Sequence, residues 1–138
     1  MKAGPFLLDT GFLVALMNSA DPAHPACADV WGGIAGPFLT TGGVLVETAH
    51  LVRGNPAGFE TAWGLLKSVG TVVVAATRPR FDRSTALMKK YADVPMDLVD
   101  ATLVALAEET GVRDVLSLDG RGFDTYRTGD GKKFKRFP

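Results

Sequence analysis

Short apolar runs alternate with longer segments of helical periodicity along this chain of 138 residues. The first run, Phe6–Leu8, stops at Asp9, and a helix is predicted to start at once with Thr10 as its N-cap. Strands that alternate with helices need crossover connections, which make the strands parallel and place helices on the faces of the sheet. The alternation therefore predicts an α/β fold with both faces of its sheet covered. Asp9 would stand at the carboxyl edge, where ligands bind in such sheets.

Apolar runs, helix caps and turn residues divide the rest of the chain into predicted strands and helices. Asn55-Pro56, for example, predicts a helix start with Asn as N-cap and Pro at the first helical position. The expected strands are Gly36–Leu39, Val115–Leu118 and Thr71–Ala75, the last a buried strand because it is apolar and rich in β-branched residues. The expected helices cover about 24–33, 40–52, 55–68, 79–91 and 97–110, and an edge hairpin is expected around 124–137.

Composition limits the classes of protein that this chain can belong to. The length favours a single domain over residues 1–138, and a hydrophobic share of 46% indicates a compact soluble protein. The net charge is zero, but the segment from Arg121 to the end contains six Lys or Arg and only two Asp. Such a local basic excess is compatible with contact to nucleic acid, although it is more commonly just a solvated end of the chain. Cys27 is the one cysteine, and the sequence shows no secretion signal and no apolar run long enough to cross a membrane, so a cytoplasmic location is expected.

Two further acids stand where charged residues are uncommon. Glu47 shares a helical stripe with Val44 and Leu51, so it points toward the core or a cleft, unless it lies on a partly exposed helix face. A carboxylate in a core must be paired, protonated or bound to a cation. Asp119 ends the run Val115–Leu118 as Asp9 ends the first run, although an Asp-Gly turn would also explain it. No helix cap is expected of Asp119.

Two acids also open the predicted helix over residues 97–110. Asp97 is a natural N-cap, which is the interpretation that we favour for it. Asp100 complements the helix dipole, but its neighbours Val99, Ala101 and Leu103 are more apolar than a capping role requires. Asp100 is therefore the stronger candidate for a role in a site.

Taken together, these acids predict one cluster at the carboxyl edge of the sheet. Like charges gathered there repel one another unless a cation holds them. A set of oxygen donors suits Mg²⁺ or Mn²⁺ rather than zinc, which prefers His and Cys. His24 and His50 show no metal-binding spacing.

The order of the acids carries a family resemblance. Asp9 before Thr10, Glu47 within a helix, Asp100 in Val99-Asp100-Ala101, and Asp119 after Ser117-Leu118 together resemble a PIN domain, and more narrowly the VapC-type toxins of bacterial toxin–antitoxin pairs. The resemblance runs from Phe6 to about Phe137. Where that group commonly has Asp-Arg-Asp-Phe, this chain has Asp119-Gly120-Arg121-Gly122-Phe123, a departure that we expect to loosen the loop without removing the ligand.

The resemblance implies a three-layer α/β/α sandwich with a mostly parallel central sheet, and an endoribonuclease that uses Mg²⁺ or Mn²⁺ to hydrolyse RNA phosphodiester bonds with a metal-activated water. It also implies a small antitoxin partner and a homodimer. Residues expected in the site are the catalytic and metal-binding acids Asp9, Glu47, Asp100 and Asp119, the further candidate ligand Asp97, the supporting hydroxyls Thr10 and Ser117, and the RNA-contact candidates Arg121, Lys132 and Lys133.

Two other functions remain open at this point. One is another Mg²⁺-dependent α/β domain that handles phosphoryl groups. A haloacid-dehalogenase phosphatase needs a second Asp two residues after the first, but Gly11 occupies that position. A response-regulator receiver needs a Lys after a late strand, but the strand Val115–Leu118 is followed by Asp119, Gly120 and Arg121. Both classes are therefore disfavoured. The other is a catalytically silent binding module with a PIN-like fold, against which the presence of all four acids counts.

Overall fold

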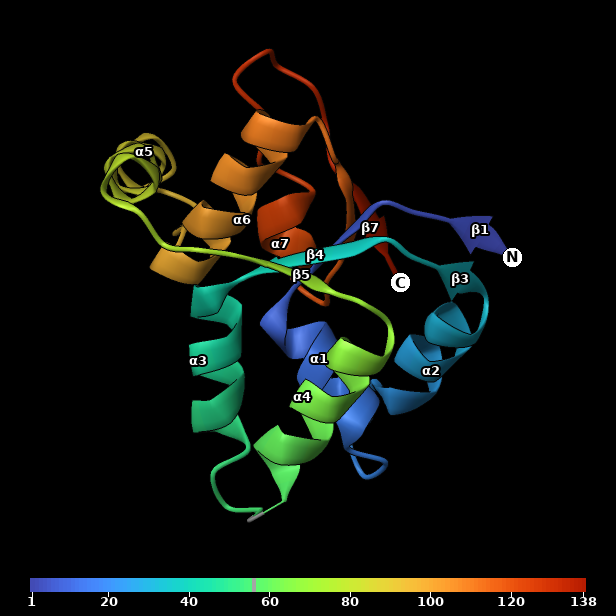
Figure 1. Ribbon diagram of the computed structural model, residues 1–138. Helices are drawn as coiled ribbons and strands as arrows, with labels where there is room; N and C mark the ends of the chain where they lie inside the picture. The colour runs from blue at the N-terminus through green and yellow to red at the C-terminus, as the bar shows by residue number, and fades with distance from the viewer. Residues whose placement is uncertain (56) are drawn as a thin grey trace.

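A parallel sheet of five strands forms the centre of the computed structural model, which describes residues 1–55 and 57–138 (Figure 1). The strands are β1 (Lys2–Ala3), β2 (Phe6–Leu8), β3 (Ile34–Ala35), β4 (Phe38–Thr41), β5 (Val72–Val74), β6 (Asp114–Leu116) and β7 (Lys135–Phe137). The helices are α1 (Thr10–Met17), α2 (His24–Gly32), α3 (Gly42–Leu51), α4 (Gly58–Ser68), α5 (Arg78–Lys90), α6 (Leu98–Thr110) and α7 (Gly120–Phe123).

The strand order brings the two acid-ending strands together. The main sheet runs β5-β4-β2-β6-β7 with every pair parallel, and β1 and β3 form a separate parallel pair. Leu8 of β2 is in register with Leu116 of β6, so the residues after both strands leave the same edge side by side. The prediction of an α/β protein with a mostly parallel sheet is confirmed.

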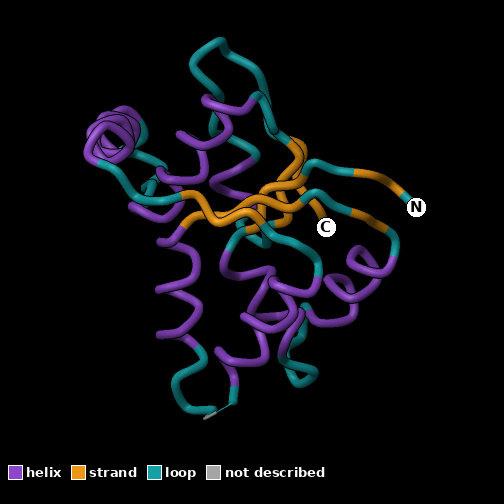
Figure 2. Tube along the Cα trace, viewed as in Figure 1, coloured by secondary structure: helices purple, strands orange, loops and turns teal. Residues whose placement is uncertain are grey.

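Each face of the sheet carries its own apolar core. Side chains alternate along a strand, so the fully buried Leu7 points to one face while Phe6 and Leu8 point to the other. Helices α5, α6 and α7 cover the face of Leu7, and α1, α2 and α4 cover the opposite face, which gives the three layers seen in Figures 1 and 2. Helix α3 continues from the carboxyl end of β4 and contacts both α1 and α6. No helix in the described part of the chain is long and apolar enough to span a membrane.

The last part of the chain differs from the prediction. The expected hairpin over 124–137 is wrong: β7 pairs in parallel with β6, and the antiparallel pairing is a single bridge between Arg127 and Lys133. The prediction of a buried strand at Thr71–Ala75 is also wrong in its burial, because β5 is an edge strand and Val72 is 51% exposed. Apolar composition does not distinguish an edge strand from a central one when its neighbours are unknown.

Helix boundaries were predicted to within a few residues, with instructive exceptions. The predicted strand Gly36–Leu39 lies two residues later, at Phe38–Thr41, so α3 begins at Gly42. Helix α4 begins at Gly58 rather than at Asn55, whose side chain instead accepts a hydrogen bond from the Ala57 amide. The predicted Pro56 at the first helical position lies outside the described residues.

Candidate active site

Asp9 is the buried centre of the carboxyl edge of the sheet. It directly follows β2, and its side chain is 6% exposed. The Thr10 amide donates to Oδ1 at 2.8 Å, and the Ser117 hydroxyl donates to Oδ2 at 2.7 Å. Asp9 rather than Thr10 is therefore the N-cap of α1, which corrects the predicted cap. Burial raises the Asp9 pKa to about 6, against the lowering effect of these two hydrogen bonds.

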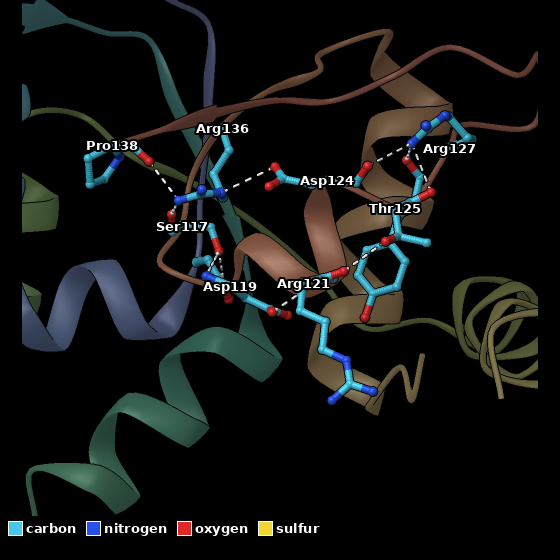
Figure 3. A network of polar contacts seen from close by, with 11 residues as sticks. Ser117, Asp119, Arg121, Asp124, Thr125, Arg127, Arg136 and Pro138 are labelled. Carbon is cyan, nitrogen blue, oxygen red and sulfur yellow. Dashed lines mark hydrogen bonds and ion pairs between the residues drawn. The ribbon is translucent and has the colours of Figure 1, made fainter. Parts of the chain in front are cut away.

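Ser117 joins Asp9 to the second strand-ending acid. Its buried hydroxyl accepts from the Asp119 amide at 3.0 Å (Figure 3). The same hydroxyl donates to Asp9, so the two aspartates share one serine. The Asp119 carboxylate accepts from the Gly122 amide at 2.9 Å and caps α7. The expectation that Asp119 caps no helix is wrong, and so is the expectation of a loosened loop, because residues 120–123 form this helix.

Asp100 faces the same edge from α6. Asp97 is the N-cap of this helix and accepts from the Asp100 amide at 2.8 Å, as the sequence predicts for a cap. The hydroxyl of the buried Tyr126 donates to Asp100 Oδ2 at 3.1 Å. Burial, together with the charges of Asp97, Asp9 and Asp119, raises the Asp100 pKa to about 7, against the lowering effect of the Tyr126 hydrogen bond. Asp97 itself is exposed.

Glu47 reaches the site from α3. Its side chain is half-buried, and its charge contributes to the raised pKa of Asp9. The predicted apolar stripe around it holds for the buried Val44 but not for Leu51, which is 53% exposed at the end of the helix. Glu47 lines a depression of about 690 Å³ between α3, α5 and α6.

The four predicted acids act on one another electrostatically without meeting at one point. The pKa of Asp9 is raised by Glu47 and Asp119, and that of Asp100 by Asp9 and Asp119. In residues 1–55 and 57–138, however, no three His, Cys, Asp or Glu side chains lie close enough together to hold a metal ion as they stand. The structure thus brings the acids to one edge but does not form a closed ligand cage.

The donor set nevertheless fits a divalent cation. It consists of carboxylates, and the raised pKa values of Asp9 and Asp100 reflect buried negative charge that a cation would compensate. The Thr10 hydroxyl, next to Asp9, is buried without a hydrogen-bond partner among the described residues. Such an unsatisfied polar group costs about 1–3 kcal/mol, which a ligand or water at the site would recover.

The predicted basic contacts separate into two places. Arg121 lies on α7 next to Asp119, and its side chain extends away from the network of Ser117, Asp124 and Arg136 (Figure 3). Lys132 and Lys133 precede β7 and therefore lie toward the amino end of the parallel sheet, away from the acids. The structure does not bring these two lysines into the acidic site.

The sequence did not predict two residues that contact the site. Tyr126 contacts Asp100, and its only sequence signal is the spacing of three from Phe123, whose ring it meets edge-on. Arg136 donates from Nη1 to the Ser117 carbonyl at 3.4 Å and from Nε to Asp124 at 3.3 Å, and so ties β7 to α7 (Figure 3). Its position depends on β7 lying parallel to β6, which the predicted hairpin did not provide.

Comparison with known proteins gives consistent matches over nearly the whole chain. The model of the PIN domain matches residues 6–128. Ribonuclease VapC26 of Mycobacterium tuberculosis is 26% identical over 135 residues, which are 96% of this chain and 99% of the relative. The crystal structure of VapC20 from M. tuberculosis, described as a sarcin–ricin loop cleaving toxin, has a TM-score of 0.77 at 24% identity and covers 83% of this chain and 90% of that one. A toxin–antitoxin complex from Klebsiella pneumoniae has a TM-score of 0.62 at 18% identity, covering 86% and 90% of the two chains. At these identities the two structures establish the shared fold alone.

Proposed function

The chain belongs to the PIN domain family, and from that premise we propose that it is a metal-dependent endoribonuclease, the toxin of a toxin–antitoxin pair. Residues 1–138 act as one such domain. The observation that carries the proposal is the placement of Asp9, which is only 6% exposed at the carboxyl edge of the sheet. The charges of Glu47 and Asp119 raise its pKa, so these acids lie near it. The name of the curated relative, a ribonuclease, and the description of the VapC20 structure support RNA as the substrate.

Asp9, Glu47, Asp100 and Asp119 would hold Mg²⁺ or Mn²⁺, with Asp97 as a further candidate. When bound by these residues, the ion would lower the pKa of a water and compensate negative charge on the phosphodiester. Site chemistry of this kind needs no nucleophilic side chain.

The protein's own contribution is to fix the acids in place. Ser117 and the Thr10 amide each hold one oxygen of Asp9, so that this carboxylate cannot rotate freely. The Gly122 amide and Tyr126 do the same for Asp119 and Asp100. Arg121, exposed beside Asp119, is placed to contact a flanking phosphate of the RNA, which positions the strand without reading its sequence.

The partners proposed from the resemblance are an antitoxin and a second copy of the chain. One matched structure is a toxin–antitoxin complex, which supports an antitoxin partner. The family resemblance implies that this antitoxin would cover the acidic site. The depression between α3, α5 and α6 supports a homodimer, because Val46, Phe81 and Leu98 on its lining are 73%, 44% and 43% exposed. Apolar exposure concentrated on one face is typical of a surface that another protein covers. An RNA substrate agrees with a cytoplasmic location.

The direct test is cleavage of a structured RNA by the purified protein with Mn²⁺, with and without EDTA. We expect cleavage that EDTA stops, and a loss of at least about a hundredfold in Asp9→Asn, which keeps the shape of the side chain but removes its charge. Asp82→Asn, an exposed acid on α5, is the matched control and should cleave like wild type. Cleavage that resists EDTA, or near wild-type cleavage by Asp9→Asn, would refute the mechanism.

The dimer is tested separately by light scattering of wild type and Phe81→Glu. A charge placed on this apolar face should halve the mass. A wild-type protein that is already monomeric would exclude the homodimer and leave the ribonuclease proposal standing.

A further inference from the structure

Basic side chains gather at the amino end of the sheet, opposite the acids. Arg113, Lys133 and Lys135 line a depression of about 330 Å³ together with Pro5 and Asp114. These residues come from three neighbouring strands or the turns before them, because Pro5 precedes β2, Asp114 begins β6 and Lys135 begins β7. Three cations thus meet one carboxylate in a chain whose total charge is zero.

Lys2 adds a fourth cation to this group. Its Nζ lies 3.4 Å from Asp114 Oδ2 and 5.7 Å from the centre of the Phe137 ring. Lys135 Nζ lies 5.2 Å from the same ring centre. Two ammonium groups held near one aromatic ring repel each other, and the single carboxylate does not neutralise both. Lys132 does not line this depression, and its ammonium pairs with Asp130 at 3.7 Å, outside the group.

We propose that Lys2, Arg113, Lys133 and Lys135, here called the amino-edge cluster, bind the phosphate backbone of the RNA at a second place remote from the acids. This inference rests on the proposed ribonuclease function. It deepens that function by requiring a substrate long enough to reach both ends of the sheet.

The geometry sets the size of that substrate. Pro5 and Asp9 lie at the two ends of β2, and four residues of strand span about 13 Å. In a duplex, one strand places a phosphate about every 3.4 Å along the axis, so the two contacts are roughly four base steps apart or more. A dinucleotide cannot occupy both places, whereas a stem or a folded loop can.

The chain also supplies a cation at the acidic end, since Arg121 lies exposed on α7 beside Asp119. Arg136 lies between the two ends on β7, but its guanidinium pairs with Asp124 at 3.3 Å. Cations at both ends of the sheet favour a long polyanion. An acidic protein would be the competing occupant, but its docking would need apolar anchors, and the depression presents mainly charged and backbone groups.

The test is the affinity of Lys133→Gln/Lys135→Gln for an RNA stem–loop of about 20 nucleotides, measured in EDTA so that binding is separated from cleavage. Loss of two phosphate contacts should raise Kd about tenfold and flatten the slope of log affinity against log salt by roughly 1.4 to 1.8. The matched control is Lys67→Gln/Lys89→Gln, which removes two exposed lysines from α4 and α5 and should bind like wild type.

Two further binding measurements distinguish RNA from an acidic protein and a long RNA from a short one. An RNA of about four nucleotides should lose much less affinity than the stem–loop, because it cannot span the sheet. Polyglutamate should bind wild type weakly and equally in both double variants. An unchanged salt slope for the stem–loop, or equal loss with polyglutamate, would overturn the proposal. If wild type cleaves no RNA but the lysine variant still loses affinity, the ribonuclease proposal fails and the RNA contact remains.

Discussion

Asp100→Asn should stabilise the metal-free protein near neutral pH. Burial and three neighbouring acids raise the pKa of the folded Asp100 to about 7, against 3.8 for the free side chain. The folded carboxyl therefore keeps its proton to a higher pH than the unfolded one. The contribution of Asp100 to folding stability is consequently greatest below pH 4. This contribution falls as pH rises from about 4 to about 7.

The size of the effect follows from that difference. A shift of about three pH units corresponds to about 4 kcal/mol, which we reduce to about 2 kcal/mol because the side chain is partly exposed and its charge is screened. Asn removes the charge and keeps an oxygen that can accept from Tyr126. For a chain of this length, about 2 kcal/mol raises Tm by roughly 6–8 °C.

The assay is a set of thermal melts of wild type and Asp100→Asn in EDTA between pH 4 and pH 8. The two proteins should melt together at pH 4 and separate progressively up to about pH 7, with the variant higher. Added Mn²⁺ should stabilise wild type more than the variant, since a ligand of the native state acts by mass action. Asp82→Asn is the control for the loss of one exposed charge on a helix. A variant that melts at or below wild type at pH 8, with a difference independent of pH, would show that Asp100 is not held among repelling charges.

Three further outcomes are expected. In RNA cleavage, Asp97→Asn should be milder than Asp100→Asn because Asn caps a helix about as well as Asp; equal losses would make Asp97 a ligand. Gly122→Ala should impair cleavage strongly, since its Cβ would collide with the Asp119 carboxylate and with the Tyr126 ring and hydroxyl at 2.9 Å, whereas Gly64→Ala meets no atom within 4 Å. Tyr126→Phe should lower the free energy of unfolding by about 1 kcal/mol and raise the Mn²⁺ concentration needed for half-maximal cleavage, and an unchanged requirement would remove Tyr126 from the site.

What the sequence revealed was the local order of strand, acid and helix. A short apolar run that ends in Asp9 can be read without knowing its neighbours, and so can the helix that Asp97 caps. The parallel sheet then followed from the crossover rule, which places the residues after β2 and β6 at one edge. These steps need only the sequence and the handedness of connections.

What it could not reveal depends on pairing between distant segments. The direction of β7 decides that Lys133 lies at the amino edge and Arg136 near Ser117, and nothing local distinguishes a parallel edge strand from the return strand of a hairpin. The burial of β5 has the same origin, since its exposure follows from its place at the end of the strand order. Tyr126 was missed because its partner, Asp100, lies 26 residues away in sequence.

The glycines after Asp119 show how a sequence departure can be misinterpreted when only flexibility is considered. Two glycines between Asp119 and Phe123 predict a looser loop, yet the segment is a helix whose first turn Asp119 caps. At Gly122 the absence of a side chain lets the Asp119 carboxylate and Tyr126 approach the backbone closely. At Gly120 a Cβ would lie 3.0 Å from the Arg136 guanidinium, the group that ties β7 to the Ser117 carbonyl. Close approach rather than freedom of φ is thus what these glycines provide, and the ordering of Asp119 depends on the missing side chain at Gly122.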